Sequence, residues 1–308
     1  MDAKERIKET ARKLGMDLCG VASIDRFAES PPGKHPTELL PGCRSVIVVA
    51  KRLLDGVVQA NFRAYEDGMY GMKGLWGTYG YTMLPNFELT YVCYAIANFI
   101  EHELDEVATP LSTGPMTNGA QISIRHSAVA AGLGEFGWLG IVLTPEFGAR
   151  QRFGVVLTTA ELEPDPMYDG PRLCDPEKCG ICTKVCPVEA LSKYGEREPK
   201  CVHMGGKTYE YCHIDMVRCL IAEYAMTKGL DGKDDYIDTL DADYAKLAKA
   251  QASMPISEAG LQHTESWHCG KCQVYCPAGN WGEHYKKRGL SKGVGAVKKV
   301  VPLGGENE

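Results

Sequence analysis

The chain has 308 residues, 44% of them apolar, and a formal net charge of −6. This length can bury a full core in one large domain or two unequal ones, and the acidic balance disfavours a dedicated nucleic-acid binder. The first residues contain no apolar signal core, and no run of about 18 apolar residues occurs, so we expect a cytoplasmic protein without a membrane span. In that reducing compartment, thirteen cysteines favour metal or redox chemistry over disulfides.

The first 165 residues alternate helical and strand patterns. Apolar residues at helical spacing predict a first helix that contains Ile7, Ala11, Leu14 and Leu18. Residues 120–131 predict another helix. Residues 19–23, 45–50, 138–144 and 153–159 are rich in β-branched residues and predict short strands. This part of the chain is therefore expected to be an α/β domain.

A long amphipathic helix is predicted over residues 88–107, with apolar residues recurring at about 100° per residue. Its apolar face consists of Leu89, Val92, Cys93, Ile96, Ile100, Leu104 and Val107. Tyr91 and Tyr94 fall on the opposite face. The pattern commits one face of this helix to the core and leaves the tyrosines available for another role.

The composition changes at the proline-rich stretch EPDPMYDGP, which ends at Pro171. We place a domain boundary there, with an α/β domain over 1–165 and a cysteine-rich domain over 166–285. Six aspartates between positions 231 and 243 mark an acidic insertion near 230–260, which we expect to face solvent. Residues 286–308 form a basic tail.

Two nearly identical strings dominate the second domain: CGICTKVCP at 179–187 and CGKCQVYCP at 269–277. In the bacterial ferredoxin pattern, closely spaced thiolates bind one cubane cluster, and the cysteine before the proline reaches across to another. We therefore predict two 4Fe-4S clusters that exchange their last ligands. One would use Cys174, Cys179, Cys182 and Cys276, and the other Cys186, Cys219, Cys269 and Cys272.

Two points in this assignment stay open. Two structural zinc sites with four thiolates each would also use paired cysteines, although the ending x3-C-P is unusual for zinc. Cys174 stands four residues before Cys179 instead of the usual two, so Cys201 and Cys212 are reserves for its place. Either reserve would leave the other seven ligands unchanged.

Six glycines stand within 23 residues of the segment that follows the predicted helix 120–131, at positions 132, 134, 137, 140, 148 and 154. Any one glycine can serve a turn, but six together suggest a backbone that closes on a large flat ligand. No G-x-G-x-x-G string follows a strand, so the nicotinamide and flavin fingerprint is missing. The pattern calls for a cofactor that binds without that motif.

Several segments, in order, resemble the corrinoid iron–sulfur reductases, which comprise the reductive dehalogenases and, more distantly, the epoxyqueuosine reductases. They are GVASIDRF, LLPGCRSVIVVA, AGLGEFGWLGIVLTPEFG with Arg150 and Arg152 after it, GVVLTT, EPDPM, the two cysteine strings and RCLIAE. The resemblance implies an α+β protein, in which a nitroreductase-like α/β domain binds base-off cobalamin and a ferredoxin-like domain carries two 4Fe-4S clusters. It also implies a small organic substrate and an electron donor of the ferredoxin or flavodoxin type.

The resemblance further implies that a tyrosine and a basic residue supply a proton beside the substrate. Tyr91 is the first candidate for the donor and Tyr94 the second, with Arg150 or Arg152 to stabilise the phenolate and Asn118 to polarise the substrate. Candidate cofactor contacts are Gly132, Gly134, Phe136, Gly137, Gly140 and Arg152. The chain has no D-x-H-x-x-G string, so it offers no histidine as a lower cobalt ligand.

Two other functions remain open. One is an epoxyqueuosine-type tRNA reductase, but the position of that branch's catalytic acid is Asn118 here, which cannot donate a carboxylic proton. The other is an electron-transfer protein that reduces the corrinoid of a different protein. The leading expectation is a cobalamin-dependent reductase of the reductive dehalogenase type.

Overall fold

A four-stranded antiparallel sheet organises the fold of the computed structural model, which describes residues 2–67, 72–81, 83–111, 122–223, 243, 245 and 269–279. Its strand order is β1-β2-β6-β3. The strands are β1 (Leu18–Ser23), β2 (Ser45–Arg52), β6 (Gln151–Thr158) and β3 (Ala108–Leu111). The mixed helix and sheet content agrees with the predicted fold class.

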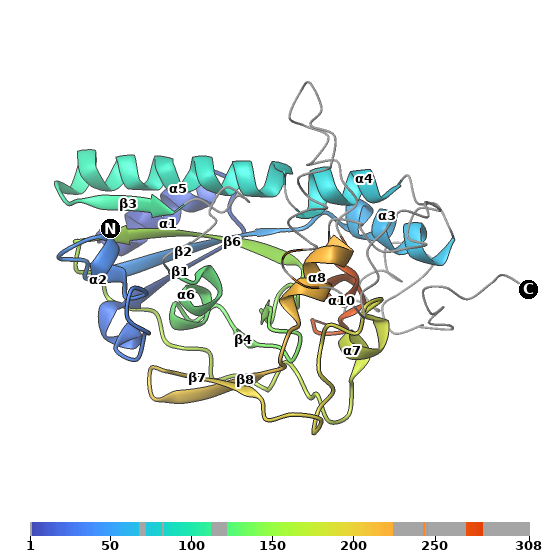
Figure 1. Cartoon of the computed structure of the whole chain (residues 1–308). Helices are drawn as coiled ribbons and strands as arrows, with labels where there is room; N and C mark the ends of the chain where they lie inside the picture. The colour runs from blue at the N-terminus through green and yellow to red at the C-terminus, as the bar shows by residue number, and fades with distance from the viewer. Residues whose placement is uncertain are drawn as a thin grey trace, which may run out of the picture.

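Both faces of the sheet are covered, which explains the continuous apolar run in β2. Alternate residues of a strand point to opposite faces. Val46 and Val48 pack toward one core cluster, whereas Ile47 and Val49 pack toward another. Figure 1 shows α1 (Ala3–Lys13) and α5 (Met83–Leu104) on one side of the sheet and α6 (Ile124–Ala130) on the other.

The ends of α1 and α5 differ from the predicted helices. The first helix stops before Gly15, whose φ of 86° favours glycine, and Leu18 begins β1 instead of continuing the helix. The long helix starts earlier than predicted and ends at Leu104, so Val107 lies outside it and is 53% exposed. The predicted stripe from Leu89 to Ile100 is buried against the sheet.

Smaller elements complete the second face of the sheet. They are η1 (Ile24–Phe27), α2 (Pro36–Leu39), the short strands β4 (Glu135–Phe136) and β5 (Val142–Leu143), and the hairpin of β7 (Lys200–Met204) and β8 (Lys207–Tyr211). The predicted strand 138–144 is thus a turn followed by β5. Met204 and Tyr209 of the hairpin pack in the same core cluster as α6, so residues on both sides of the proposed boundary at 165/166 share one core.

A second group of helices packs beside the end of the sheet. It consists of α3 (Asp55–Glu66), α4 (Lys73–Trp76), the π-helical turn η3 (Gly77–Tyr81), α7 (Ile181–Val185), α8 (Met216–Glu223) and α10 (Lys271–Tyr275). Trp76 is fully buried there among Phe62, Val185 and Val274. Within the described residues, no helix is long and apolar enough to cross a membrane.

Candidate functional site

The two cysteine strings have nearly the same backbone conformation. Gly180 (φ 57°, ψ 14°) precedes α7, and Gly270 (φ 56°, ψ 8°) precedes α10. These left-handed angles favour glycine. The helices pack against each other, as Figure 1 also shows, and each ends at a cysteine in extended conformation that precedes a proline. The repeated sequence therefore builds two copies of one turn-and-helix unit, side by side.

Four other cysteines act on Cys182. Burial raises the pKa of its thiol, and so do the charges of Cys276, Cys174, Cys212 and Cys179. The backbone N–H of Trp138 donates to Cys174 Sγ at 3.3 Å. The sequence predicts Cys174, Cys179, Cys182 and Cys276 for one cluster, with Cys212 as a reserve. We call these four predicted ligands the first quartet.

The remaining four predicted ligands gather around Cys272. Burial raises the pKa of this thiol well above its ordinary value, and Cys269, Cys219 and Cys186 raise it further. The backbone N–H of Ala190 donates to Cys186 Sγ at 3.2 Å. We call Cys186, Cys219, Cys269 and Cys272 the second quartet. Each string contributes to both quartets, as the ferredoxin pattern predicts.

The two reserve cysteines occupy different surroundings. Cys212 is fully buried in the apolar cluster that also contains Cys182 and Cys276. Burial raises the pKa of Cys212 to about 12. Cys201 is exposed on β7, away from that cluster. Only Cys212 is therefore placed to replace Cys174 in the first quartet.

The surroundings of the quartets fit iron–sulfur clusters. An amide N–H points at a sulfur of each quartet, and such hydrogen bonds stabilise the negative charge that cluster sulfurs carry. Metal binding deprotonates a thiol outright, which offsets the cost of burying its charge. Among the described residues, no group of three or more histidines, cysteines or acids is arranged to hold a single metal ion.

Side chains of the sheet domain hold the second string in place. Arg150 is fully buried, and its Nη2 donates to the carbonyl oxygens of Val274 at 2.6 Å and Cys276 at 2.8 Å. Gln273 Nε2 donates to the carbonyl of Ala149 at 2.6 Å. Arg150 thus acts on the backbone of the cysteine string, and its role beside a substrate stays a prediction.

Helix α3 supports the same string from the other side. Asn61 Nδ2 and the Tyr65 hydroxyl both donate to the carbonyl oxygen of Cys269, at 3.2 and 3.3 Å. The Tyr275 hydroxyl donates to Glu66. These bonds fix the entry and the exit of α10. No sequence motif marks Asn61 or Tyr65, because their role depends on a contact between segments that are distant in the chain.

The predicted proton donors Tyr91 and Tyr94 lie on the outer face of α5, with 64% and 63% of their surface exposed. The sheet packs against the opposite face of this helix, so both side chains point away from the sheet. Tyr81, at the end of η3, is a further tyrosine on which the cysteines act, because the charges of Cys219 and Cys272 raise its pKa.

Tyr81 belongs to a small polar group at the start of α5. The guanidinium carbon of Arg152 lies 4.9 Å from the centre of the Tyr81 ring. Arg152 also donates to Asn86 Oδ1 from Nε at 3.3 Å and from Nη2 at 3.2 Å. The negative charge of Glu223 and burial raise the pKa of Tyr81 well above its ordinary value, whereas Arg152 lowers it. Sequence reasoning missed Tyr81, Asn86 and Glu223.

The predicted cofactor glycines approach the protein's own atoms. A Cβ at Gly132 would lie 2.1 Å from the carbonyl oxygen of Pro166, and one at Gly134 would lie 1.9 Å from that of Leu143. Gly137 and Gly140 are closed in by side chains of the protein in the same way. Phe136 is buried against His126, Tyr209 and Tyr211. These contacts account for the small residues and the burial of Phe136.

Three features that the sequence singles out cannot be located. Asn118 lies outside the described residues, as do nearly all of the acidic insertion and the whole basic tail.

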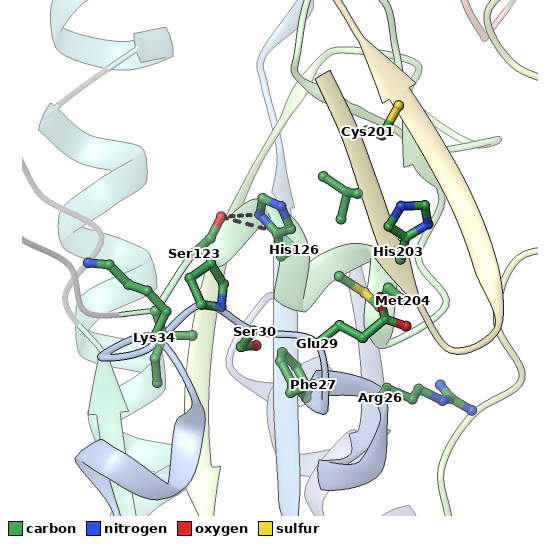
Figure 2. Close-up of a pocket in the computed structure, with 13 residues that line it drawn as sticks. Arg26, Phe27, Glu29, Ser30, Lys34, Ser123, His126, Cys201, His203 and Met204 are labelled. Atoms are coloured by element: carbon green, nitrogen blue, oxygen red, sulfur yellow. Dashed lines mark hydrogen bonds between the residues drawn. The ribbon is translucent and has the colours of Figure 1, made fainter. Parts of the chain in front are cut away.

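A separate cavity of about 320 Å³ lies between η1, α6 and β7. Figure 2 shows His126, His203 and Cys201 at its wall, with Phe27 and Met204 also lining it. Burial lowers the pKa of His126 to about 4, and its Nδ1 lies 2.6 Å from Ser123 Oγ. Of the residues that the sequence singles out, only the reserve Cys201 lines this cavity.

Comparison with known proteins gives two groups of relatives. A tetrachloroethene reductive dehalogenase of Desulfitobacterium hafniense is 37% identical over an alignment of 258 residues, which covers 71% of this chain and 44% of that protein. An epoxyqueuosine reductase of Staphylococcus aureus is 29% identical over 235 residues, 68% of this chain and 57% of that protein. The chain is a relative of both families. It spans about half the length of these curated relatives.

Solved structures support the fold. An epoxyqueuosine reductase, in a complex with a tRNA stem loop, superposes with a TM-score of 0.51 at 16% identity and covers 90% of this chain and 65% of that one. No family model matches the sequence. All the relatives named here are reductases, as the sequence predicts. The resemblance to the reductive dehalogenases and the epoxyqueuosine reductases is therefore confirmed.

Proposed function

We propose that this protein is a corrinoid-dependent and iron–sulfur-dependent reductase of the reductive dehalogenase type, acting on a small organic substrate. The observation that carries the proposal is the arrangement of the cysteine strings, which contribute reciprocally to two quartets beside a tyrosine–arginine pair. The greater identity to a dehalogenase than to the epoxyqueuosine reductases favours this branch. An external one-electron donor of the ferredoxin or flavodoxin class would supply the electrons.

The proposal includes a finer description of the fold. Residues 1–165 would form a nitroreductase-like domain, and residues 166–285 would form a ferredoxin-like domain with two 4Fe-4S clusters. Hydrogen bonds such as those from Arg150 to Val274 and Cys276 tie the two parts together. The first and second quartets would be the cluster ligands, with Cys212 as the reserve for Cys174.

The corrinoid is proposed from the family that the sequence segments resemble, whereas the clusters are proposed from the cysteines of this chain. When bound, a base-off corrinoid would supply a cobalt centre that takes up electrons and passes them to the substrate. The glycines at 132, 134, 137 and 140 approach protein atoms, and their role as cofactor contacts stays a prediction. Arg152 stays a candidate because its side chain belongs to the polar group around Tyr81.

Within this function, we assign the proton donor to Tyr81 in place of Tyr91 or Tyr94. A tyrosine hydroxyl is protonated near neutral pH, so Tyr81 holds a proton to donate. The guanidinium of Arg152 would stabilise the phenolate that remains, and Asn86 would hold that guanidinium in position. Asn118 keeps its proposed role of polarising the substrate.

The test is an anaerobic assay of the full chain, loaded with iron, sulfide and cobalamin. Tetrachloroethene, named for a relative, serves as the probe substrate and reduced methyl viologen as the electron donor. Release of chloride that depends on cobalamin would support the proposal. Clusters without bound cobalamin would favour an electron-transfer protein, and salt-sensitive binding of a tRNA stem loop would favour the epoxyqueuosine branch. Either result would overturn the proposal.

A further inference from the structure

The two cysteine strings differ in charge at the position between the two cysteines of each C-G-x-C segment. The residue after the left-handed glycine is Ile181 in the first string and Lys271 in the second. Ile181 packs at the edge of the apolar cluster around Trp76. Since α7 and α10 are copies of one unit, an uncharged and a charged side chain occupy equivalent sites between two predicted ligands.

Lys271 is held close to the second quartet by aromatic rings. Its Nζ lies 4.7 Å from the centre of the Tyr65 ring and 5.7 Å from that of Tyr275. Tyr65 in turn donates to the carbonyl of Cys269. Burial lowers the pKa of Lys271, whereas the charges of Cys269, Glu66 and Cys186 act in the opposite direction. Two of these three groups are members of the second quartet.

A fixed positive charge beside a cluster changes the energy of its reduced form. Reduction adds one electron, and therefore one negative charge, to a cluster that already carries net negative charge from its thiolates. A partly buried ammonium attracts the reduced form more than the oxidised form, and the attraction is stronger than in water because the surroundings are less polar. Charge and hydrogen bonding around the sulfurs set the potential of such clusters.

We propose that Lys271 raises the reduction potential of the second-quartet cluster above the value that this cluster would have with an uncharged residue at position 271. This inference rests on the proposed function, since it needs both clusters. One electron from the external donor reduces one cluster and oxidises the donor by one electron. The charge of Lys271 then shifts the equilibrium of that electron toward the second quartet. That quartet includes Cys219 and Cys272, which are the cysteines that act on Tyr81. Lys271 thus directs electrons to the cluster beside the proposed proton donor.

The experiment is an anaerobic redox titration of the cluster-loaded chain, followed by electron paramagnetic resonance. Lys271→Met removes the charge at similar length, and Lys271→Arg keeps it. We expect Lys271→Met to lower one of the two midpoint potentials by about 59 mV or more, equivalent to about a tenfold change in the reduction equilibrium. The other potential should move much less, and Lys271→Arg should resemble the unaltered protein. Unchanged potentials in Lys271→Met would overturn the inference.

The reciprocal variant keeps the test informative if Lys271→Met fails to retain a cluster. Ile181→Lys places the charge at the equivalent site of the first string and should raise one of the two midpoint potentials. No rise in Ile181→Lys would then overturn the inference. Iron and sulfide contents of the unaltered chain separate this outcome from failure of the proposed function. A chain without two clusters contradicts both proposals, whereas two clusters with unshifted potentials contradict only the role of Lys271.

Discussion

Arg152 lies over the ring of Tyr81, with its guanidinium carbon 4.9 Å from the ring centre. This pair joins strand β6 to the turn that precedes α5. The charges of Cys219 and Cys272 both raise the pKa of Tyr81, which indicates that the pair lies near these thiols. The pair therefore connects the sheet to the second quartet and gives the proposed reaction a proton donor.

Replacement of Tyr81 tests that assignment. Tyr81→Phe removes only the hydroxyl, so both clusters and corrinoid binding should persist. Loss of a positioned general acid costs roughly 10²- to 10⁴-fold in rate, and we expect turnover to fall within that range. Tyr91→Phe is the matched control and should retain full turnover, because Tyr91 is exposed on the outer face of α5. Full turnover in Tyr81→Phe together with a large loss in Tyr91→Phe would assign the proton donor to Tyr91 instead.

Removal of single cysteines tests the two quartets. Cys182→Ala and Cys272→Ala should each remove one cluster and leave about half of the iron, since each deletes a ligand of a different 4Fe-4S cluster. Both should also reduce stability, because metal binding contributes to folding. Cys201→Ala is the control and should retain all the iron, as its thiol is exposed on β7. Full iron in both ligand variants, by chemical analysis, would show that the ligand assignment is wrong.

Arg150 should prove structural. Arg150→Met removes the hydrogen bonds to the carbonyls of Val274 and Cys276 and leaves both carbonyls buried. An unsatisfied buried group costs about 1–3 kcal/mol, so we expect the free energy of unfolding to fall by roughly 2–4 kcal/mol. Chemical denaturation measures this change, and Arg150→Lys should recover part of it. A stable Arg150→Met protein with full iron but no turnover would instead indicate a role in the reaction.

Asp165 gives a prediction for pH. Burial raises the pKa of its carboxyl, but Lys8, Lys4 and the N–H of Val21 lower it more, so the net shift is downward. A group with a depressed pKa in the folded state adds stability above its unfolded pKa, about 3.9, and loses it as pH falls through the folded value. Asp165→Asn should therefore cost about 1–2 kcal/mol at pH 7 and progressively less below pH 4. An equal loss of stability at pH 7 and below pH 4 would exclude an effect of the carboxylate charge.

The sequence predicted the cysteine groups better than the catalytic residues, for a physical reason. Ligands separated by two or three residues must lie close together. The same left-handed turn occurs in both strings, and the two helices that follow pack against each other. The position of Tyr81 depends instead on the packing of η3 against distant segments. The sequence analysis chose its tyrosines from the helical pattern over residues 88–107. That pattern shows which face of the helix avoids the core, but it cannot show whether this face meets solvent or a substrate.

Sequence spacing also failed to predict the different surroundings of Arg150 and Arg152. Arg150 and Arg152 are two residues apart and would share one side of a regular strand. However, β6 begins at Gln151, so Arg150 belongs to the preceding turn and is buried, whereas Arg152 reaches Tyr81. Similarly, a glycine pattern cannot show whether a Cβ would meet a ligand or the protein. At Gly132 and Gly134 it would meet carbonyl oxygens of Pro166 and Leu143.

The most direct test of the proposed function is the absorption spectrum of the anaerobic chain after reconstitution with iron, sulfide and cobalamin. We predict broad iron–sulfur absorption that bleaches on reduction, together with the spectrum of protein-bound base-off cobalamin. Iron and sulfide should each be near eight per chain, for two 4Fe-4S clusters. A colourless, zinc-loaded protein in which cobalamin keeps the spectrum of the free cofactor would contradict the account.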